Sequence, residues 1–275
     1  MKNFQLSLLF EINGISSASG LVYNDEFLYI ISDSSTYLYK YHMPEDKLYK
    51  IALVKNAQEN IPKKQKLDFE SISLKGNDLL ILGSGSTANR NLFLKYDIIT
   101  ENIVEKSFAD LYKKIKEETG IKDDEFNIEG LMATNKTMYF LQRGNGSNSK
   151  NGIIYSNITE INSKFKFVPI ELPKIKNIET TFTDAILIDN TIYFLATAED
   201  TNSTYDDGEI LGGIIGSINL ETMTVNFTEK ITDDKKLEGI TLFKQTDDQI
   251  EFLLCEDNDT EELISNIYLL KMKRE

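Results

Sequence analysis

Five polar residues recur along the sequence, and each opens a stretch in which a small residue precedes alternating apolar residues. In chain order they are Ser19, Glu70, Glu129, Asp184 and Glu238, at spacings of 51, 59, 55 and 54 residues. Carboxylate and hydroxyl oxygens are the ligands that Ca²⁺ prefers, because it takes six to eight oxygens in flexible geometry. Acids brought together would raise one another's pKa values unless a cation offset their charge. The pattern therefore predicts a Ca²⁺ site made by these five residues.

A simpler reading of the same acids stays open. Each of them can accept backbone N–H bonds from a neighbouring repeat and only hold the repeats together. Zinc is excluded as the metal, because the sequence has one histidine and one cysteine and lacks the nitrogen and sulfur ligands that Zn²⁺ prefers.

A second group of positions lies 14 residues after each of the first four residues and 18 residues after the fifth, in loops rich in Ser, Gly, Asn and acidic residues. Only three arginines occur in the chain, and two of them, Arg90 and Arg143, fall in these loops. An arginine fork suits phosphate or carboxylate, although pairing with the abundant acids is an equal alternative. We predict Asp33 and Arg143 as catalytic residues. The predicted substrate-binding residues are Ser84, Ser86, Arg90, Gln142, Arg143, Asn145, Glu199 and Glu256.

The elements that must position these residues are short apolar strands separated by polar turns. Four of the five repeats contain four such strands, and the fifth contains three. Repeats of this length with four strands are typical of propeller blades. We therefore predict an all-β, five-bladed β-propeller, a single domain over residues 1–275, in which strand 4–10 completes the last blade. The spacing of Phe108, Leu111, Tyr112 and Ile115 predicts one amphipathic helix between blades 2 and 3.

The composition of the chain limits the classes of molecule that the protein is expected to bind. The net charge of −14 argues against nucleic acid, because no basic run offsets it. The N-terminal apolar run is too short for a signal peptide, and no stretch reaches the 18 apolar residues of a membrane span. We expect a cytoplasmic monomer that binds neither membrane nor nucleic acid, with an anionic small molecule as its partner.

The five motifs resemble those of the calcium-activated nucleotidases, the apyrase family. That family is a five-bladed propeller in which Ser, Glu, Glu, Ser and Glu from successive blades hold a central Ca²⁺. Ser19, Glu70, Glu129 and Glu238 match this order, whereas Asp184 replaces the fourth Ser. The chain also resembles, more closely, a family of uncharacterised bacterial propellers. That resemblance is carried by Asp68-Phe69-Glu70, Leu82-Gly83-Ser84-Gly85-Ser86 with Arg90, Asn127-Ile128-Glu129-Gly130 and Gln142-Arg143-Gly144-Asn145.

Three functions follow from these patterns. The first is a Ca²⁺-dependent hydrolase of a phosphorylated or other anionic small molecule, in which the metal polarises the substrate and Asp33 orients water. The second is a non-catalytic binding or scaffold propeller with a structural cation. The third, a glycosidase using two channel acids, ranks last because no pair stands out and the chain has no Trp.

Overall fold

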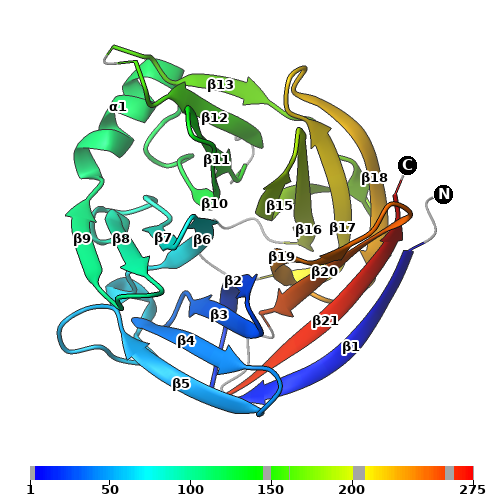
Figure 1. The fold of residues 1–275 in the computed structure, drawn as a ribbon. Helices are drawn as coiled ribbons and strands as arrows, with labels where there is room; N and C mark the ends of the chain where they lie inside the picture. The colour runs from blue at the N-terminus through cyan, green and yellow to red at the C-terminus, as the bar shows by residue number, and fades with distance from the viewer. Residues whose placement is uncertain (1–3, 145–149, 161, 201–207, 258–262, 275) are drawn as a thin grey trace.

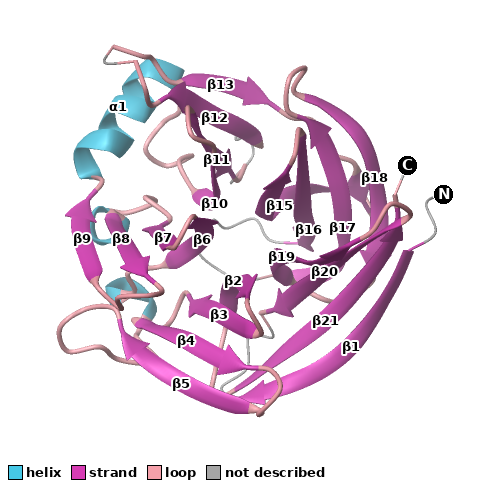
Figure 2. Ribbon diagram, in the orientation of Figure 1, coloured by secondary structure: helices cyan, strands magenta, loops and turns pink. Residues whose placement is uncertain are grey.

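Five antiparallel sheets stand around a common axis like the blades of a propeller (Figures 1 and 2). The structure is a computed structural model and describes residues 4–144, 150–160, 162–200, 208–257 and 263–274. Within each sheet, strands that are consecutive in the chain pair with one another, so each blade is a meander; in the last sheet the outermost strand comes instead from the start of the chain. The predicted five-bladed all-β propeller is confirmed.

In blades 1 to 4 the strands are ordered from the axis to the outer edge as follows. Blade 1 contains β2 (Ala18–Asn24), β3 (Phe27–Ser32), β4 (Tyr37–His42) and β5 (Lys47–Ala52). Blade 2 contains β6 (Phe69–Lys75), β7 (Asp78–Gly83), β8 (Leu92–Asp97) and β9 (Ile103–Ser107). Blade 3 contains β10 (Ile128–Ala133), β11 (Thr137–Gln142), β12 (Gly152–Asn157) and β13 (Lys166–Pro169). Blade 4 contains β15 (Ile178–Ile188), β16 (Thr191–Asp200), β17 (Glu209–Asn219) and β18 (Thr224–Thr232), with a two-residue strand, β14 (Lys174–Ile175), beside β15.

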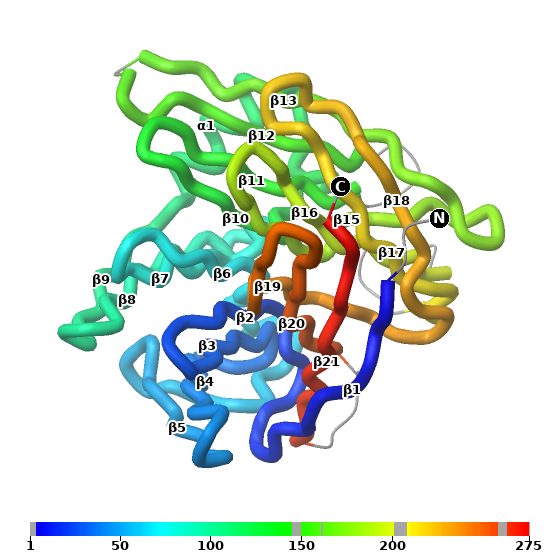
Figure 3. The backbone as a smooth tube through the Cα atoms, turned by 45° about the vertical axis from the view of Figure 1, so that its right-hand side comes forward, coloured from blue at the N-terminus to red at the C-terminus, as the bar shows by residue number. Residues whose placement is uncertain are grey.

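The ring is closed by a strand from the other end of the chain. Blade 5 contains β19 (Leu237–Gln245), β20 (Gln249–Glu256), β21 (Ile264–Lys273) and, outermost, β1 (Phe4–Asn13). Strand β1 pairs antiparallel with β21 from Phe4 opposite Met272 to Asn13 opposite Ile264. Figure 3 shows the two strands side by side along the edge of the molecule. This pairing confirms the predicted closure.

The predicted helix is also present. Helix α1 (Ala109–Thr119) lies at the periphery between blades 2 and 3, and it ends at Gly120, whose φ of 76° is a left-handed conformation that glycine adopts without strain (Figure 1). Its apolar face buries Tyr112 and Ile115 in a core shared by blades 2 and 3. Two short 3-10 helices cover residues Lys63–Gln65 and Ala88–Arg90. No helix in the described part of the chain is long and apolar enough to cross a membrane.

Every innermost strand carries a β-bulge near its start. At each bulge the register of pairing with the second strand skips one residue, which leaves that residue unpaired and turns its side chain out of the ladder. The skipped residues are Ser19, Glu70, Glu129, Thr183 and Glu238. The bulges therefore give five equivalent positions around the axis.

Candidate metal centre

The bulges confirm four of the five equivalent positions predicted from sequence and move the fourth by one residue. In blade 4 the skipped residue is Thr183, and Asp184 lies at the next position, which is Gly20 in blade 1 and Gly130 in blade 3. The shift restores a hydroxyl at the fourth position. The equivalent set is thus two hydroxyls and three glutamates.

The hydroxyls and Asp184 link neighbouring blades. Ser19 Oγ donates to the carbonyl of Phe69 at 2.5 Å, and Thr183 Oγ1 donates to the carbonyl of Leu237 at 2.7 Å. Asp184 accepts backbone N–H bonds from Ala185 at 2.7 Å and from Ile240 at 2.8 Å, so both of its oxygens are engaged. Asp184 therefore has the inter-blade role that was the simpler alternative for these acids.

The three glutamates differ because of the residue two positions earlier. Successive residues of a strand point to opposite faces, so residues i and i+2 share a face. In blade 3, Asn127 Nδ2 donates to Glu129 Oε1 at 2.5 Å, and in blade 5, Lys236 Nζ lies 2.9 Å from Glu238 Oε1. In blade 2 this position holds another acid, Asp68. Within the described residues, Glu70 has neither a hydrogen-bond donor nor an ion-pair partner.

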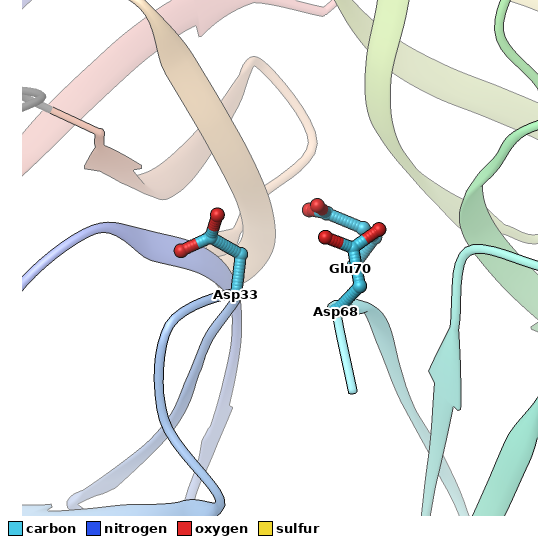
Figure 4. Close-up of side chains that lie close together, drawn as sticks. All are labelled: Asp33, Asp68 and Glu70. Carbon is cyan, nitrogen blue, oxygen red and sulfur yellow. The ribbon is translucent and has the colours of Figure 1, made fainter. Parts of the chain in front are cut away.

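Asp68 and Glu70 of blade 2 form an acidic cluster with Asp33, which follows strand β3 of blade 1. One carboxylate oxygen of each residue lies within 4.8 Å of the others, and Figure 4 shows Asp68 and Glu70 side by side with Asp33 across from them. Oxygens on opposite sides of a Ca²⁺ ion lie about 4.6–5.2 Å apart, twice the usual Ca–O distance. Asp33 Oδ1 is buried without a hydrogen-bond partner. The acidic cluster therefore has the spacing and the unused oxygens of a cation site.

The electrostatics of the channel acids reflect burial first and mutual repulsion second. Burial raises the pKa of Glu70 well above its usual range, and Asp68 and Glu129 raise it further. Burial also raises the pKa of Asp33 by more than the nearby Lys66 lowers it. The pKa of Glu238 is raised to about 8 by burial, although Lys236 pulls it down. The basic groups near Asp33 and Glu238 therefore offset only part of the effect of burial on the pKa values of these two acids.

Each basic group near the axis is already paired with an acid. Lys66 Nζ lies 2.5 Å from Asp33 Oδ2, and Arg90 Nη1 lies 2.8 Å from Asp68 Oδ2. Arg143 bridges two blades, with Nη1 3.4 Å from Glu129 Oε1 and Nη2 3.0 Å from Glu199 Oε2. Lys236 lies between Glu238 and Asp257. Pairing with acids, the alternative considered for the arginines, is what the structure contains.

The predicted substrate-binding residues fall into two groups. Ser84, Ser86 and Arg90 come together beside Asp68: Ser84 Oγ donates to Asp68 Oδ2 at 2.5 Å, and Arg90 Nη1 donates to Ser86 Oγ at 3.0 Å. They support the acidic cluster.

The second group makes separate structural contacts. The side-chain amide of Gln142 donates to two backbone carbonyls, those of Glu125 and Arg143, each at 2.6 Å. Glu256 accepts hydrogen bonds from Tyr268 and Asn266. Asn145 lies outside the described residues.

Sequence reasoning missed several residues of the site. Asp68, Lys66, Thr183, Lys236 and Asp257 were not predicted as site residues, although all lie beside predicted ones. The two-residue alternation of strands is a signal that could have found Asp68 and Lys236. Asp257, rather than Glu256, is the position in blade 5 that is equivalent to Ser84 in blade 2 and Arg143 in blade 3. The backbone N–H of Asp257 donates to the carbonyl of Lys236, just as the N–H of Ser84 donates to the carbonyl of Asp68 and that of Arg143 to the carbonyl of Asn127.

Fold and site together define a five-bladed β-propeller with an acidic cluster at one end of its axis. A family model matches residues 14–272, and the chain belongs to that family, a family of unknown function named DUF6929. Among curated proteins, none matches the sequence.

Solved structures support the fold at low sequence identity. The major allergen Mala s 1 of Malassezia sympodialis is 9% identical with a TM-score of 0.58, over 98% of this chain and 97% of that one. A luciferin-regenerating enzyme is 10% identical with a TM-score of 0.50, over 98% and 95%. The tail fibre of Staphylococcus aureus phage P68 is 10% identical with a TM-score of 0.51, over 98% of this chain and 53% of that one. At these identities the likeness concerns the fold alone.

Proposed function

We propose that the protein binds a divalent cation, Ca²⁺, at the end of the propeller axis. The observation that supports this most directly is the convergence of one oxygen each from Asp33, Asp68 and Glu70 within 4.8 Å. Glu129 and Glu238 would supply further carboxylates from the neighbouring blades. Ser19 and Thr183, rather than Asp184, would supply hydroxyl oxygens at the equivalent positions.

The local charge supports a cation over an anion as the primary ligand. Among the described residues, the acidic cluster and the ion pairs beside it contain seven acids and four basic groups, which leaves a surplus of three negative charges when all are ionised. The acids are Asp33, Asp68, Glu70, Glu129, Glu199, Glu238 and Asp257, and the basic groups are Lys66, Arg90, Arg143 and Lys236. An anion would add to the surplus, whereas one divalent cation would reduce it to a single charge. Ca²⁺ is favoured because every candidate ligand is an oxygen and Ca²⁺ accepts six to eight oxygens in flexible coordination geometry.

The test is thermal unfolding of chelator-stripped protein with Ca²⁺, Mg²⁺ or no added cation. Binding to the folded state alone stabilises it by RT ln(1 + [L]/Kd), about 2.7 kcal/mol at a hundredfold excess over Kd. A Ca²⁺-specific rise in Tm supports the proposal. The absence of any shift with either ion, together with no metal in the purified protein, would refute it.

Hydrolysis of an anionic small molecule, such as a phosphate ester or phosphoanhydride, is the second candidate function. It is favoured by Asp33, whose Oδ1 is buried without a hydrogen-bond partner and could accept a proton from water; burial raises the pKa of this carboxyl group. When bound, the cation would polarise a substrate oxygen, and Arg143 would contact the anion only by giving up Glu129 or Glu199. Ca²⁺-dependent turnover of nucleotides or phosphate esters that is lost in Asp33→Asn would support this activity. Cation binding without turnover would favour the non-catalytic alternative.

A further inference from the structure

Lys66 occupies an unusual place beside the acidic cluster. Its ammonium lies 2.5 Å from Asp33 Oδ2, and its side chain is only 17% exposed. Burial alone would lower the pKa of Lys66, but the attraction of Asp33, followed by Glu70 and Asp68, raises it overall. One ammonium group thus feels all three members of the acidic cluster.

The two basic residues at the acidic cluster are held in different ways. Arg90 Nη1 contacts both Asp68 and Ser86, and Nη2 reaches the carbonyl of Lys63 at 3.4 Å. The Lys66 ammonium has no hydrogen-bond partner other than Asp33 in the part of the chain that the structure describes. A lysine ammonium is strongly hydrated and sits on a flexible stem, so it moves into water more readily than a bidentate arginine.

The backbone of Lys66 is held by its loop, whereas its ammonium group is held by Asp33 alone among the described residues. Asn89 Nδ2 donates to the Lys66 carbonyl at 2.6 Å, and the residue follows the short 3-10 helix Lys63–Gln65 at the surface. Rotation about the side-chain bonds alone can therefore take the ammonium away from Asp33 without moving the loop. Both carboxylate oxygens of Asp33, Oδ2 after Lys66 has left it and the unpartnered Oδ1, would then be available to a cation bound beside Asp68 and Glu70.

We propose that Lys66 is the resident counter-ion of the acidic cluster, and that a divalent cation binds by displacing its ammonium from Asp33. This inference rests on the proposed cation site and adds its regulation. Displacement weakens the affinity for every cation, but it penalises monovalent ions most, because they replace one positive charge with another and gain nothing in net charge. Lys66 thereby sets the selectivity of the site for doubly charged ions.

The test compares Ca²⁺ binding, by isothermal titration calorimetry, in chelator-stripped wild-type protein and in Lys66→Met. We expect the variant to bind Ca²⁺ at least tenfold more tightly. Lys64→Met is the matched control, because Lys64 is exposed on the same segment and its loss changes the net charge equally. The control should change the Kd less than threefold.

A second measurement uses the unmodified sequence. Lysine acetylation read by mass spectrometry should label Lys66 faster in saturating Ca²⁺ than in chelator, while Lys64 labels at the same rate in both. Two results would overturn the displacement while leaving the cation site in place, provided that the wild type binds Ca²⁺. One is a Ca²⁺ affinity of Lys66→Met that is equal to or weaker than that of the wild type. The other is a rate of Lys66 acetylation that Ca²⁺ does not change. Failure of both wild type and variant to bind Ca²⁺ would overturn both proposals.

Discussion

Replacing Glu70 with glutamine tests whether Glu70 is a metal ligand or an acid that holds neighbouring blades together. Glu70 has two acids within 4.8 Å and no donor in the described structure, so its charge should destabilise the cation-free protein. We expect Glu70→Gln to raise the stability of that form and to abolish the Ca²⁺-induced shift in Tm. An acid that held the blades together would have the opposite effect on stability.

The size of the effect follows from the distances. At an effective dielectric constant of about 20, two unit charges about 4.8 Å apart repel by about 3.5 kcal/mol. Glu70 has two such neighbours, and attraction by Lys66 offsets roughly one of them. The net gain is thus up to about 3 kcal/mol when Glu70 is ionised, or a rise in Tm of about 6–12 °C for a domain of this size. It shrinks at low pH, because the raised pKa of Glu70 leaves its carboxyl protonated there.

The assay is differential scanning fluorimetry at pH 6 and pH 8.5, in chelator and in Ca²⁺. Glu105→Gln serves as the control, because Glu105 is exposed on the outermost strand β9 of the same blade. A lower Tm for Glu70→Gln in chelator, combined with a Ca²⁺ shift equal to that of wild type, would refute both the repulsion and the assignment of Glu70 as a ligand.

Three further predictions concern pH, blade contacts and the helix. The pKa of Glu238 is raised to about 8, so the folded state binds more protons than the unfolded state between about pH 4.5 and 8. Denaturation in chelator should therefore show stability falling as pH rises through this window, by up to roughly 5 kcal/mol, with a smaller fall in Ca²⁺. Asp184→Asn should lower the free energy of unfolding in urea by roughly 2 kcal/mol, because it weakens hydrogen bonds from two backbone amides. The same substitution should change the Ca²⁺ Kd less than threefold in calorimetry. A large loss of Ca²⁺ affinity would instead indicate that Asp184 is a ligand. Tyr112→Phe should cost about 1 kcal/mol in the same unfolding assay, because it removes the bond to the Gly83 carbonyl, and an unchanged midpoint would contradict this.

The fold was largely readable from the sequence because its signals are local and repeated. Turn residues, strand alternation and the five similar motifs each act within one blade, so their period reports the ring directly. Helix α1 was equally visible, since its apolar spacing and Gly120 lie within one segment. The closing strand was inferred by counting, because the fifth repeat lacked a strand that residues 4–10 could supply.

The site was only partly readable because bulges and pairings are not local. A bulge shifts the register by one residue, and nothing in the run Thr183-Asp184-Ala185 reveals which residue is skipped. The composition of the acidic cluster depends on the distance between the loop after β3 and the start of β6, in different blades. The role of Lys66 could not be predicted, because a lysine in a polar loop carries no signal until its ion-pair partner in another blade, Asp33, is known.

The pairing of β1 with β21 also sets an order in time. The two strands lie about 250 residues apart in the chain, and at synthesis rates of about 5–20 residues per second the second emerges roughly 12–50 s after the first. During that interval β1 has no partner, and it carries the exposed Leu8 and Leu9. The first segment of the propeller to leave the ribosome is thus the last to be paired, and its sequence must stay soluble and unattached until the fifth blade exists.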